Sequence, residues 1–372
     1  MRQSVLILGG YGNFGKRIAQ ALADDGIDVM IAGRNQAKAD ALVQQLPKGL
    51  AYSVCFDINT TLEGQLEALQ PAVVINTCGP FQNSDYRVAE TCIHHGIHYI
   101  DLADGRDFVT GITALHEQAS NQGVTVISGA STVPGLSSAV IEHFRHEFES
   151  IETLKFGISP GQQAERGLAT TQGILSYVGK PLKPFAGHRQ QVYGWQDLYR
   201  QDYPTLGNRW MANCDIPDLD LLPARYGIRN IQFSAGLELG FMHLGLWGLS
   251  WLVRMGIPLN LGVFARPLLR LSNVFNGMGS ADGGMHMIVS GRDKNGNART
   301  RSWFIIVRDG HGPHIPTIPA IVLAKKLVRK EIELSGAMPC VGLVSLDEYL
   351  QTLQHYHIQI YSYEEQCAAP QA

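Results

Sequence analysis

Short apolar runs and longer segments of helical periodicity alternate along the first third of the chain. Runs of four to six apolar residues predict strands buried on both faces, and the segments between them predict amphipathic helices. Strands separated by single helices are typical of a parallel sheet. The expected strands are 5–8, 27–32, 51–56, 72–76, 98–102 and 124–128, and the later helices between them are near 37–46, 62–69, 86–94 and 109–121.

This pattern predicts an α/β fold in which residues 1–140 form a doubly wound parallel Rossmann sheet, with ligands at the carboxyl ends of its strands. The 372 residues exceed the size of a usual single core, so a second domain is expected. Residues 141–372 alternate less regularly. We expect them to form a second, smaller α+β domain.

Two elements of this second region have clear patterns. Apolar runs at 285–290 and 303–307 flank Asn295-Gly296, which predicts a β-hairpin. Residues 317–330 have an apolar face and predict a helix, which can pack back on the first domain. The sequence therefore does not define a sharp boundary between the two domains near residue 140. Residues 179–235 show no clear periodicity.

The most apolar part of the chain is residues 237–271. Its longest uncharged run, residues 239–253, is shorter than the about 20 residues that a membrane-spanning helix needs. Three interpretations remain open: a dimer interface or core, an apolar wall of a substrate pocket, or contact with a membrane surface. We expect a homodimer formed through the second domain.

A glycine-rich turn follows the first expected strand and reads Gly9-Gly10-Tyr11-Gly12-Asn13-Phe14-Gly15. Gly10, Gly12 and Gly15 occupy the glycine positions of G-x-G-x-x-G. In that motif the glycines allow a tight turn, close approach of a pyrophosphate and close packing of the next helix, whose N-terminus faces the phosphates. The turn therefore predicts a dinucleotide site.

The end of the second expected strand indicates which dinucleotide is bound. The strand closes with Gly33-Arg34-Asn35, and Lys38 follows one helical turn later. A free ribose 2′-OH is usually bound by Asp or Glu at this position, whereas a 2′-phosphate requires a cation. The sequence therefore favours NADP over NAD.

Composition excludes several other classes of protein. The net charge is −3 and no basic stripe is interleaved with aromatic residues, so a nucleic-acid partner is not expected. The six cysteines form no C-x-x-C pair, and the N-terminus lacks a signal-peptide pattern, which predicts a reduced, cytoplasmic protein. His311 and His314 form an H-x-x-H without neighbouring acidic or cysteine ligands, so no metal site is expected.

Several short motifs follow the expected strand ends. They are the glycine-rich turn, A-G-R-N at 32–35, N-T-C-G-P-F-Q at 76–82, H-Y-I-D-L-A-D-G at 98–105 and S-T-V-P-G-L-S at 131–137, with further short runs at 311–320 and 336–340. Through these motifs the chain resembles the saccharopine dehydrogenase-like oxidoreductases over residues 1 to about 140, and again weakly near the C-terminus. The resemblance implies an NADP-binding domain followed by a smaller α+β domain that closes over it and often dimerises.

The same resemblance implies roles for individual residues, motif by motif. The pyrophosphate would be held by Gly12, Asn13, Phe14 and Gly15, the adenosine 2′-phosphate by Arg34 and Asn35, the adenine side by Asp57, and the nicotinamide ribose by Cys78, Gly79, Pro80 and Phe81.

Hydride transfer also needs a proton donor or charge stabiliser beside the reacting carbon. Asp101 and Asp104 follow an expected strand and have suitable positions, although a turn or cap role is the alternative for both. His311 lies in a glycine-flanked turn, and histidine is the residue type whose unperturbed pKa suits proton transfer near neutrality. We therefore predict His311, with Asp104, as the acid/base residues, and no nucleophilic role for Cys78, which has no base beside it in the pattern.

These features predict an NADP-dependent oxidoreductase that transfers a hydride to a C=N, C=O or C=C bond of a small molecule. The apolar segment at 237–271 favours an apolar substrate. The competing hypothesis is a non-catalytic NADP-binding sensor or scaffold. The lack of an obvious catalytic dyad or Tyr-x-x-x-Lys motif is compatible with both hypotheses.

Overall fold

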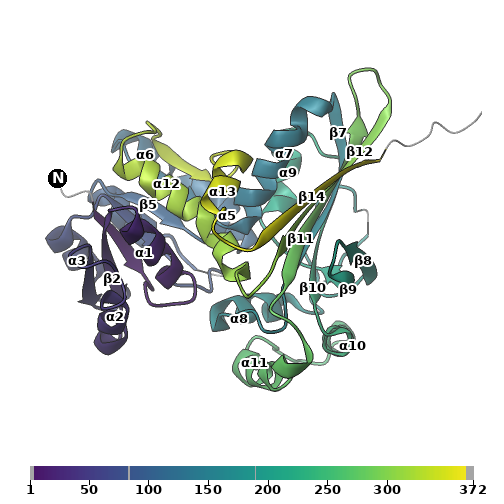
Figure 1. Cartoon of the computed structure of the whole chain (residues 1–372), viewed down its shortest axis with the longest axis horizontal. Helices are drawn as coiled ribbons and strands as arrows, with labels where there is room; N and C mark the ends of the chain where they lie inside the picture. The colour runs from purple at the N-terminus through teal and green to yellow at the C-terminus, as the bar shows by residue number, and fades with distance from the viewer. Residues whose placement is uncertain (1–3, 83, 189, 366–372) are drawn as a thin grey trace, which may run out of the picture. The chain divides into compact units, whose positions relative to one another are not determined.

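The computed structural model describes residues 4–82, 84–188 and 190–365. The chain divides into two compact units (Figure 1). Unit 1 contains the described residues up to 139 together with residues 314–352. Unit 2 contains residues 140–313 and the described residues from 353 onward. Unit 1 is thus built from two segments that are far apart in the sequence.

Unit 1 is organised around a sheet of seven parallel strands in the order β13-β6-β5-β4-β1-β2-β3. The order reverses between β1 and β4, which is where ligands bind in doubly wound folds. The predicted Rossmann sheet is confirmed, and β13 is an addition to it. The strands are β1 (Ser4–Leu8), β2 (Asp28–Gly33), β3 (Ala51–Cys55), β4 (Val73–Asn76), β5 (His98–Asp101), β6 (Thr125–Ser128) and β13 (Gly336–Pro339).

Helices cover both faces of this sheet because its strands are apolar on both sides. Leu6 and Leu8 join one core cluster with side chains of α3, α4 and α6. Val5 and Ile7 alternate with them and are also fully buried. Helix α12 packs against α1, β1, β4 and β5 (Figure 1). The helices are α1 (Gly15–Asp24), α2 (Gln36–Val43), α3 (Leu62–Leu69), α4 (Arg87–His94), α5 (Arg106–Gly111), α6 (His116–Asn121), α12 (Ile318–Val328) and α13 (Leu346–Thr352).

The helix expected near 109–121 is replaced by three short segments, α5, a 3-10 turn at residues 112–115, and α6. The Tyr86 hydroxyl donates a hydrogen bond to the carbonyl of Phe108 at 2.7 Å, so this carbonyl has a side-chain partner close to the break. Gly111, a poor helix former, lies at the same point. The prediction of one continuous helix was wrong for these two reasons.

Unit 2 contains a mixed seven-stranded sheet in the order β14-β12-β11-β7-β10-β9-β8, in which only β7 and β10 are parallel neighbours. The predicted hairpin is confirmed, because β11 and β12 pair from Gly283↔Val307 to Arg292↔Ala298 around the Asn-Gly turn. The strands are β7 (Ser150–Ser159), β8 (Tyr199–Tyr203), β9 (Gly207–Asn213), β10 (Asn230–Leu237), β11 (Gly283–Arg292), β12 (Ala298–Val307) and β14 (Ile358–Glu365).

Residues 179–235, which showed no periodicity, contain β8, β9 and most of β10. These strands carry buried polar side chains, so they lack the alternation of apolar and polar residues that predicts a strand. Arg209 in β9 is 6% exposed and forms an ion pair with Glu238, and Asn213 is 1% exposed. The larger helices that begin in or near unit 2 are α7 (Ser137–Phe144), α8 (Leu168–Tyr177), α9 (Asp218–Tyr226), α10 (Gly240–Arg254) and α11 (Ala265–Val274).

Candidate functional site

The glycine-rich turn connects β1 to α1 in a conformation that depends on its glycines. Gly9 has a φ of +74°, which L side chains rarely adopt. The amide of Gly12 donates a hydrogen bond to the Gly9 carbonyl at 2.8 Å, and an added Cβ on Gly12 would lie 3.0 Å from that oxygen. An added Cβ on Gly15 would lie only 2.4 Å from it, so α1 can approach the turn only with glycine there.

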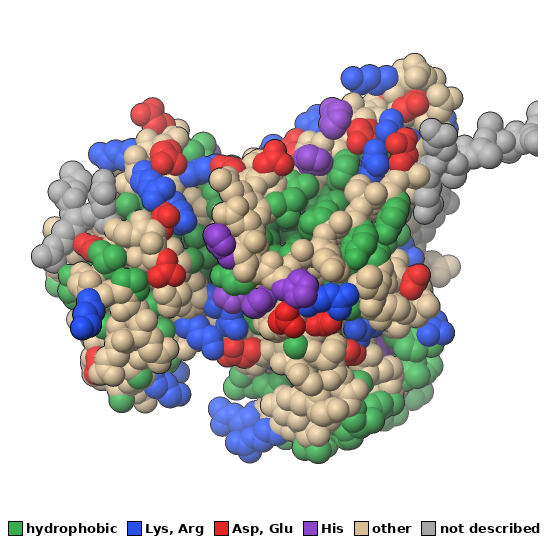
Figure 2. All heavy atoms as spheres, viewed as in Figure 1, with side chains coloured by type: hydrophobic (Ala, Val, Ile, Leu, Met, Phe, Trp, Pro, Cys, Tyr) green, Lys and Arg blue, Asp and Glu red, His purple; other side chains and the backbone are tan. Residues whose placement is uncertain are grey.

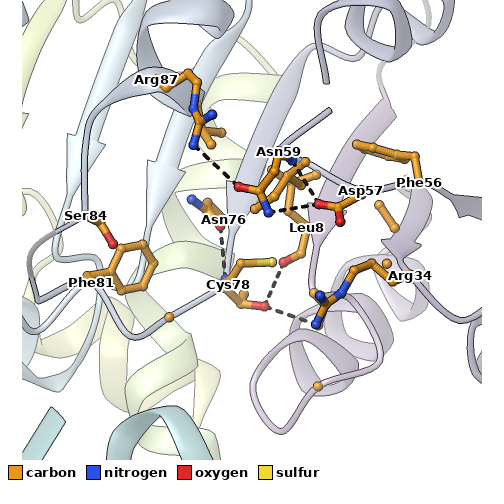
Figure 3. A pocket seen from close by; sticks show the side chains of 18 of the residues that line it. Leu8, Arg34, Phe56, Asp57, Asn59, Asn76, Cys78, Phe81, Ser84 and Arg87 are labelled. Atoms are coloured by element: carbon orange, nitrogen blue, oxygen red, sulfur yellow. Dashed lines mark hydrogen bonds between the residues drawn. The ribbon is translucent and has the colours of Figure 1, made fainter. Parts of the chain in front are cut away.

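A cavity of about 620 Å³ lies in unit 1 at the carboxyl ends of β1, β2, β3 and β4. It is of the size of small-molecule and cofactor sites, and it occupies the place where doubly wound sheets bind nucleotides. Figure 3 shows how side chains from these separate strand ends converge on it. The predicted site residues that line it are Gly12, Arg34, Asp57, Cys78, Gly79 and Phe81.

The remaining predicted cofactor residues, Gly10, Asn13, Phe14, Gly15, Asn35 and Pro80, belong to the same turns but are not part of the cavity wall. Asn35 has a structural task, because its side chain accepts a hydrogen bond from the amide of Lys38 at 3.0 Å and caps α2. Its part in binding the 2′-phosphate stays a prediction.

Arg34 places a cation at the edge of the cavity, directly after β2. Burial raises the pKa of Cys78 and the Arg34 charge opposes that rise, whereas the Asn59 backbone hydrogen bond lowers the pKa of Asp57 and the Arg34 charge adds to that effect. Residues 33–35 include no carboxylate. This corner of the cavity is therefore suited to an anion such as a 2′-phosphate, and it lacks the acid that usually binds a free 2′-OH.

Tyr11, which the sequence reasoning did not select, joins the two turns that form this corner. Its hydroxyl accepts a hydrogen bond from the backbone amide of Asn35 at 3.1 Å. Its ring covers Gly33 so closely that an added Cβ there would lie 2.4 Å from the Tyr11 Cε1. The aromatic residue between the first two motif glycines was the only sequence signal for this contact.

Asp57 follows β3 and lies in a turn that fixes its carboxylate. One carboxylate oxygen accepts hydrogen bonds from the amide and the side chain of Asn59, both at 2.9 Å. The backbone hydrogen bond is the main cause that lowers the pKa of Asp57. Asn59 also accepts a hydrogen bond from Arg87 at 3.4 Å, which links this turn to the start of α4 across the cavity (Figure 3).

The loop after β4 contributes the opposite wall. The Asn76 side chain accepts a hydrogen bond from the amide of Cys78 at 3.0 Å and donates one to the Tyr99 hydroxyl at 3.2 Å. Burial raises the pKa of the Cys78 thiol to about 11. The thiol is therefore protonated near neutral pH, which supports our expectation that Cys78 is no nucleophile.

Asp104 contacts this wall. Its carboxylate accepts a hydrogen bond from Gln82 at 3.1 Å, and the backbone of Gly105 packs against that of residues 81–82. Burial raises the pKa of Asp104, while the hydrogen bond from Gln82 opposes that rise. A carboxyl group with a raised pKa keeps its proton to a higher pH than a free one, which is a property of general acids.

Asp101 has a structural role instead. One of its carboxylate oxygens accepts hydrogen bonds from the amides of Ala103 and Gly129 and from the Ser128 hydroxyl, at 2.8–2.9 Å. Complete burial raises the pKa of Asp101 to about 6, although these hydrogen bonds oppose the rise. The residue joins the end of β5 to the end of β6, consistent with the turn or cap role.

His311 belongs to unit 2, in the turn after β12, whereas Asp104 belongs to unit 1. Its Nδ1 accepts a hydrogen bond from the backbone amide of His357 at 3.1 Å, and its ring meets that of Tyr356 edge-on. The predicted pairing of His311 with Asp104 in catalysis stays a prediction. Within the described residues, no group of three or more His, Cys, Asp or Glu side chains has a metal-binding arrangement.

Comparison with known proteins gives a family model and a fold. Residues 5–127 match the model of the saccharopine dehydrogenase NADP binding domain. The apo saccharopine dehydrogenase (L-Glu forming) of Saccharomyces cerevisiae is similar in structure, with a TM-score of 0.68 and 14% identity over 97% of this chain and 99% of the yeast chain. An amine dehydrogenase from Mycobacterium smegmatis gives a TM-score of 0.49 and 11% identity over 91% and 94%. No curated protein matches in sequence.

Proposed function

We propose, from the premise that residues 5–127 belong to the NADP-binding domains of the saccharopine dehydrogenase family, that the chain is an NADPH-dependent reductase of a small molecule. The reaction would transfer a hydride to a C=N, C=O or C=C bond. The single observation that carries this proposal is the cavity at the switch point of the unit 1 sheet, which has Arg34 at the corner where a 2′-phosphate is bound in such domains.

The residues around the cavity fit the cofactor, which supplies the hydride when bound. Gly12 exposes backbone to the cavity where a side chain would block a pyrophosphate. Arg34 can form a charge-assisted pair with the 2′-phosphate. The Asp57–Asn59 turn and Arg87, which line the cavity, are proposed to face the adenine, and the loop 78–81 is proposed to face the nicotinamide ribose.

Two residues are proposed to stabilise the developing negative charge and to supply a proton during the reduction. Because Nδ1 of His311 accepts a hydrogen bond from a backbone amide, the neutral ring carries its proton on Nε2. We propose that the Nε2–H group donates a hydrogen bond that stabilises the heteroatom or carbon gaining negative charge, while the proton that completes the reduction is supplied by solvent. Asp104, whose pKa is raised by burial, is proposed as a second proton donor, held by Gln82 beside the loop that follows β4.

A substrate screen tests the proposal. NADPH oxidation is followed with imines, ketones and enones, including apolar members of each class. On a consumed substrate, His311→Ala is expected to slow turnover by roughly 10²–10⁴-fold while NADPH affinity is unchanged. His355→Ala, an exposed histidine of the same unit, is the control.

The screen also separates the reductase from the sensor hypothesis. If NADPH binds and no substrate class is consumed, the non-catalytic sensor or scaffold gains support. If His311→Ala retains full activity, the proton comes from another group, and Asp104→Asn becomes the variant that decides its source.

A further inference from the structure

Exposed apolar side chains are concentrated on one part of unit 2. Ten of the thirteen large hydrophobic residues that are exposed in the described chain lie between residues 241 and 278. They belong to α10, α11 and the segments that follow each helix. Figure 2 shows hydrophobic side chains gathered over these helices. We call these ten residues the apolar face, and a surface of this kind usually marks an interaction site.

Helix α10 has an apolar stripe where a surface helix normally has polar residues. Phe241, Leu244, Trp251 and Met255 follow helical spacing and are between 39% and 67% exposed. An added Cβ on Gly245 or Gly248 would have no atom within 4 Å, so the space around this side of the helix is open. The outer side of α10 is therefore unpartnered within unit 2.

The inner sides of α10 and α11 pack against a buried cluster of unit 2. Trp247 and Val253 of α10 and Leu268 of α11 pack against buried Leu175 and Trp195. The Phe241 and Phe275 rings, at 5.2 Å, join the start of α10 to the residue after α11. Part of the 237–271 segment is thus core, as one of our three interpretations expected. The apolar face is presented by a packed scaffold.

The charges of this region have only one sign. Residues 239–281 contain Arg254, Arg266 and Arg270 and no Asp or Glu. Arg266 and Arg270 are exposed on α11, and neither forms an ion pair or hydrogen bond with another described residue. Arg254 contacts Gln196 and lies over the Trp251 ring at 4.8 Å. The charged residues within this segment are therefore all cations, and the acids that border it, Glu238 and Asp282, are paired with Arg209 and Arg308.

We propose that the apolar face binds the surface of an anionic lipid bilayer. A second copy docked on the same face would bring three more arginines of residues 239–281 and no carboxylate from that segment, so the two copies could not neutralise these charges. Anionic headgroups complement these arginines, while Phe, Trp, Leu and Met side chains enter the acyl boundary. In the described residues no helix is long and apolar enough to cross a bilayer, so α10 and α11 would lie in its plane.

Vesicle sedimentation with the full chain tests this proposal. Vesicles of phosphatidylcholine with phosphatidylglycerol are compared with phosphatidylcholine alone, in low and high salt. We expect the protein to sediment with the anionic vesicles and less in high salt. Arg266→Gln with Arg270→Gln should weaken binding by about fivefold for each charge removed.

Two double variants make the test specific to the apolar face. Val263→Glu with Val274→Glu changes side chains that are 72% and 75% exposed, so folding is preserved, and vesicle binding should be lost. Tyr52→Glu with Ile360→Glu adds the same charge at exposed apolar positions elsewhere and should leave vesicle binding unchanged. Near-ultraviolet circular dichroism checks that all variants are folded.

Several results would overturn the proposal. One is equal binding to neutral and anionic vesicles; another is binding that survives Val263→Glu with Val274→Glu. A third is no vesicle binding together with a dimer in light scattering that the same double variant dissociates, which would assign the apolar face to a second copy. A protein that neither sediments with any vesicle nor dimerises also refutes it.

Discussion

The hydroxyl of Tyr11 accepts a hydrogen bond from the backbone amide of Asn35, so the glycine-rich turn after β1 is tied to the residue that follows Arg34. The glycine-rich turn and the corner of the cavity that holds Arg34 are thereby held in a fixed relation. Cofactor affinity should depend on this link as well as on the residues that contact the cofactor.

Tyr11→Phe tests that dependence, because it removes the hydrogen bond and keeps the ring over Gly33. A net hydrogen bond contributes about 0.5–1.5 kcal/mol, so we expect NADPH to bind roughly 2- to 10-fold more weakly. Tyr52→Phe, which removes a hydroxyl bonded to the Gly49 carbonyl in the same unit, should leave the affinity unchanged. Fluorescence titration with NADPH measures both, and equal losses in the two variants would contradict the role of Tyr11.

Arg34 should decide between the two nicotinamide cofactors. A charge-assisted pair with the 2′-phosphate is worth about 1.5–3 kcal/mol, so Arg34→Ser should weaken NADPH binding by roughly 10- to 150-fold and change NADH binding little. Arg34→Asp should reverse the preference. Lys294→Ser, an exposed cation on the unit 2 hairpin, is the control. The assignment fails if the unmodified protein binds NADH and NADPH equally.

Two glycines of the same turn should respond differently to alanine. Gly15→Ala places a Cβ 2.4 Å from a backbone oxygen, so we expect the free energy of unfolding to fall by roughly 1–3 kcal/mol. Gly12→Ala meets that oxygen at 3.0 Å and narrows the cavity, so its main effect should be a loss of NADPH affinity of about tenfold. Thermal unfolding without cofactor and NADPH titration separate the two effects.

His286 of β11 is fully buried between two tyrosine hydroxyls. The hydroxyl of Tyr203 lies 2.8 Å from Nδ1, and that of Tyr199 lies 3.4 Å from Nε2. Burial, with a smaller effect of Lys155, lowers the pKa of His286 to about 3 from its usual 6.5. Between these two pH values the unfolded chain binds more protons at this residue than the folded chain does, so acidification favours unfolding.

The contribution of His286 to stability should therefore be complete above about pH 6.5 and decrease as the pH falls. The expected loss is about 2 kcal/mol by pH 5. His286→Gln should be less stable at pH 7.5 but should show a smaller further loss between pH 7 and pH 5. His146→Gln, which alters an exposed histidine of unit 2, should keep the original slope. Urea unfolding at several pH values gives these slopes.

Elements whose conformation depends on residues adjacent in the sequence were predicted correctly. The strands of the Rossmann sheet were predictable because burial on both faces leaves continuous apolar runs. The glycine-rich turn and Arg34 were predictable because each follows a strand directly. In contrast, β13 has the sequence Gly-Ala-Met-Pro, which lacks the β-branched residues typical of strands, and it forms only because β6 offers an unpaired edge.

Features that depend on distant contacts could not be read from the sequence. The break between α5 and α6 involves the hydroxyl of Tyr86, which precedes Phe108 by 22 residues. Asn76 and Tyr99 line the cavity and bond to each other from separate strands. Arg87 faces the cavity because α4 starts there. The place of each of these side chains on the cavity depends on how separate strand ends lie together in the sheet, which its neighbours in the sequence do not indicate.

The two-segment construction of unit 1 has a consequence for biosynthesis. Helix α12 and strand β13 complete the nucleotide-binding sheet and its helical layer, yet the ribosome makes them only after all of residues 140–313. The emerging N-terminal segment must keep apolar surface of β1, β4 and β5 uncovered throughout that synthesis. We therefore expect the incomplete sheet to be most prone to aggregation during this interval, until the chain has been synthesised through β13.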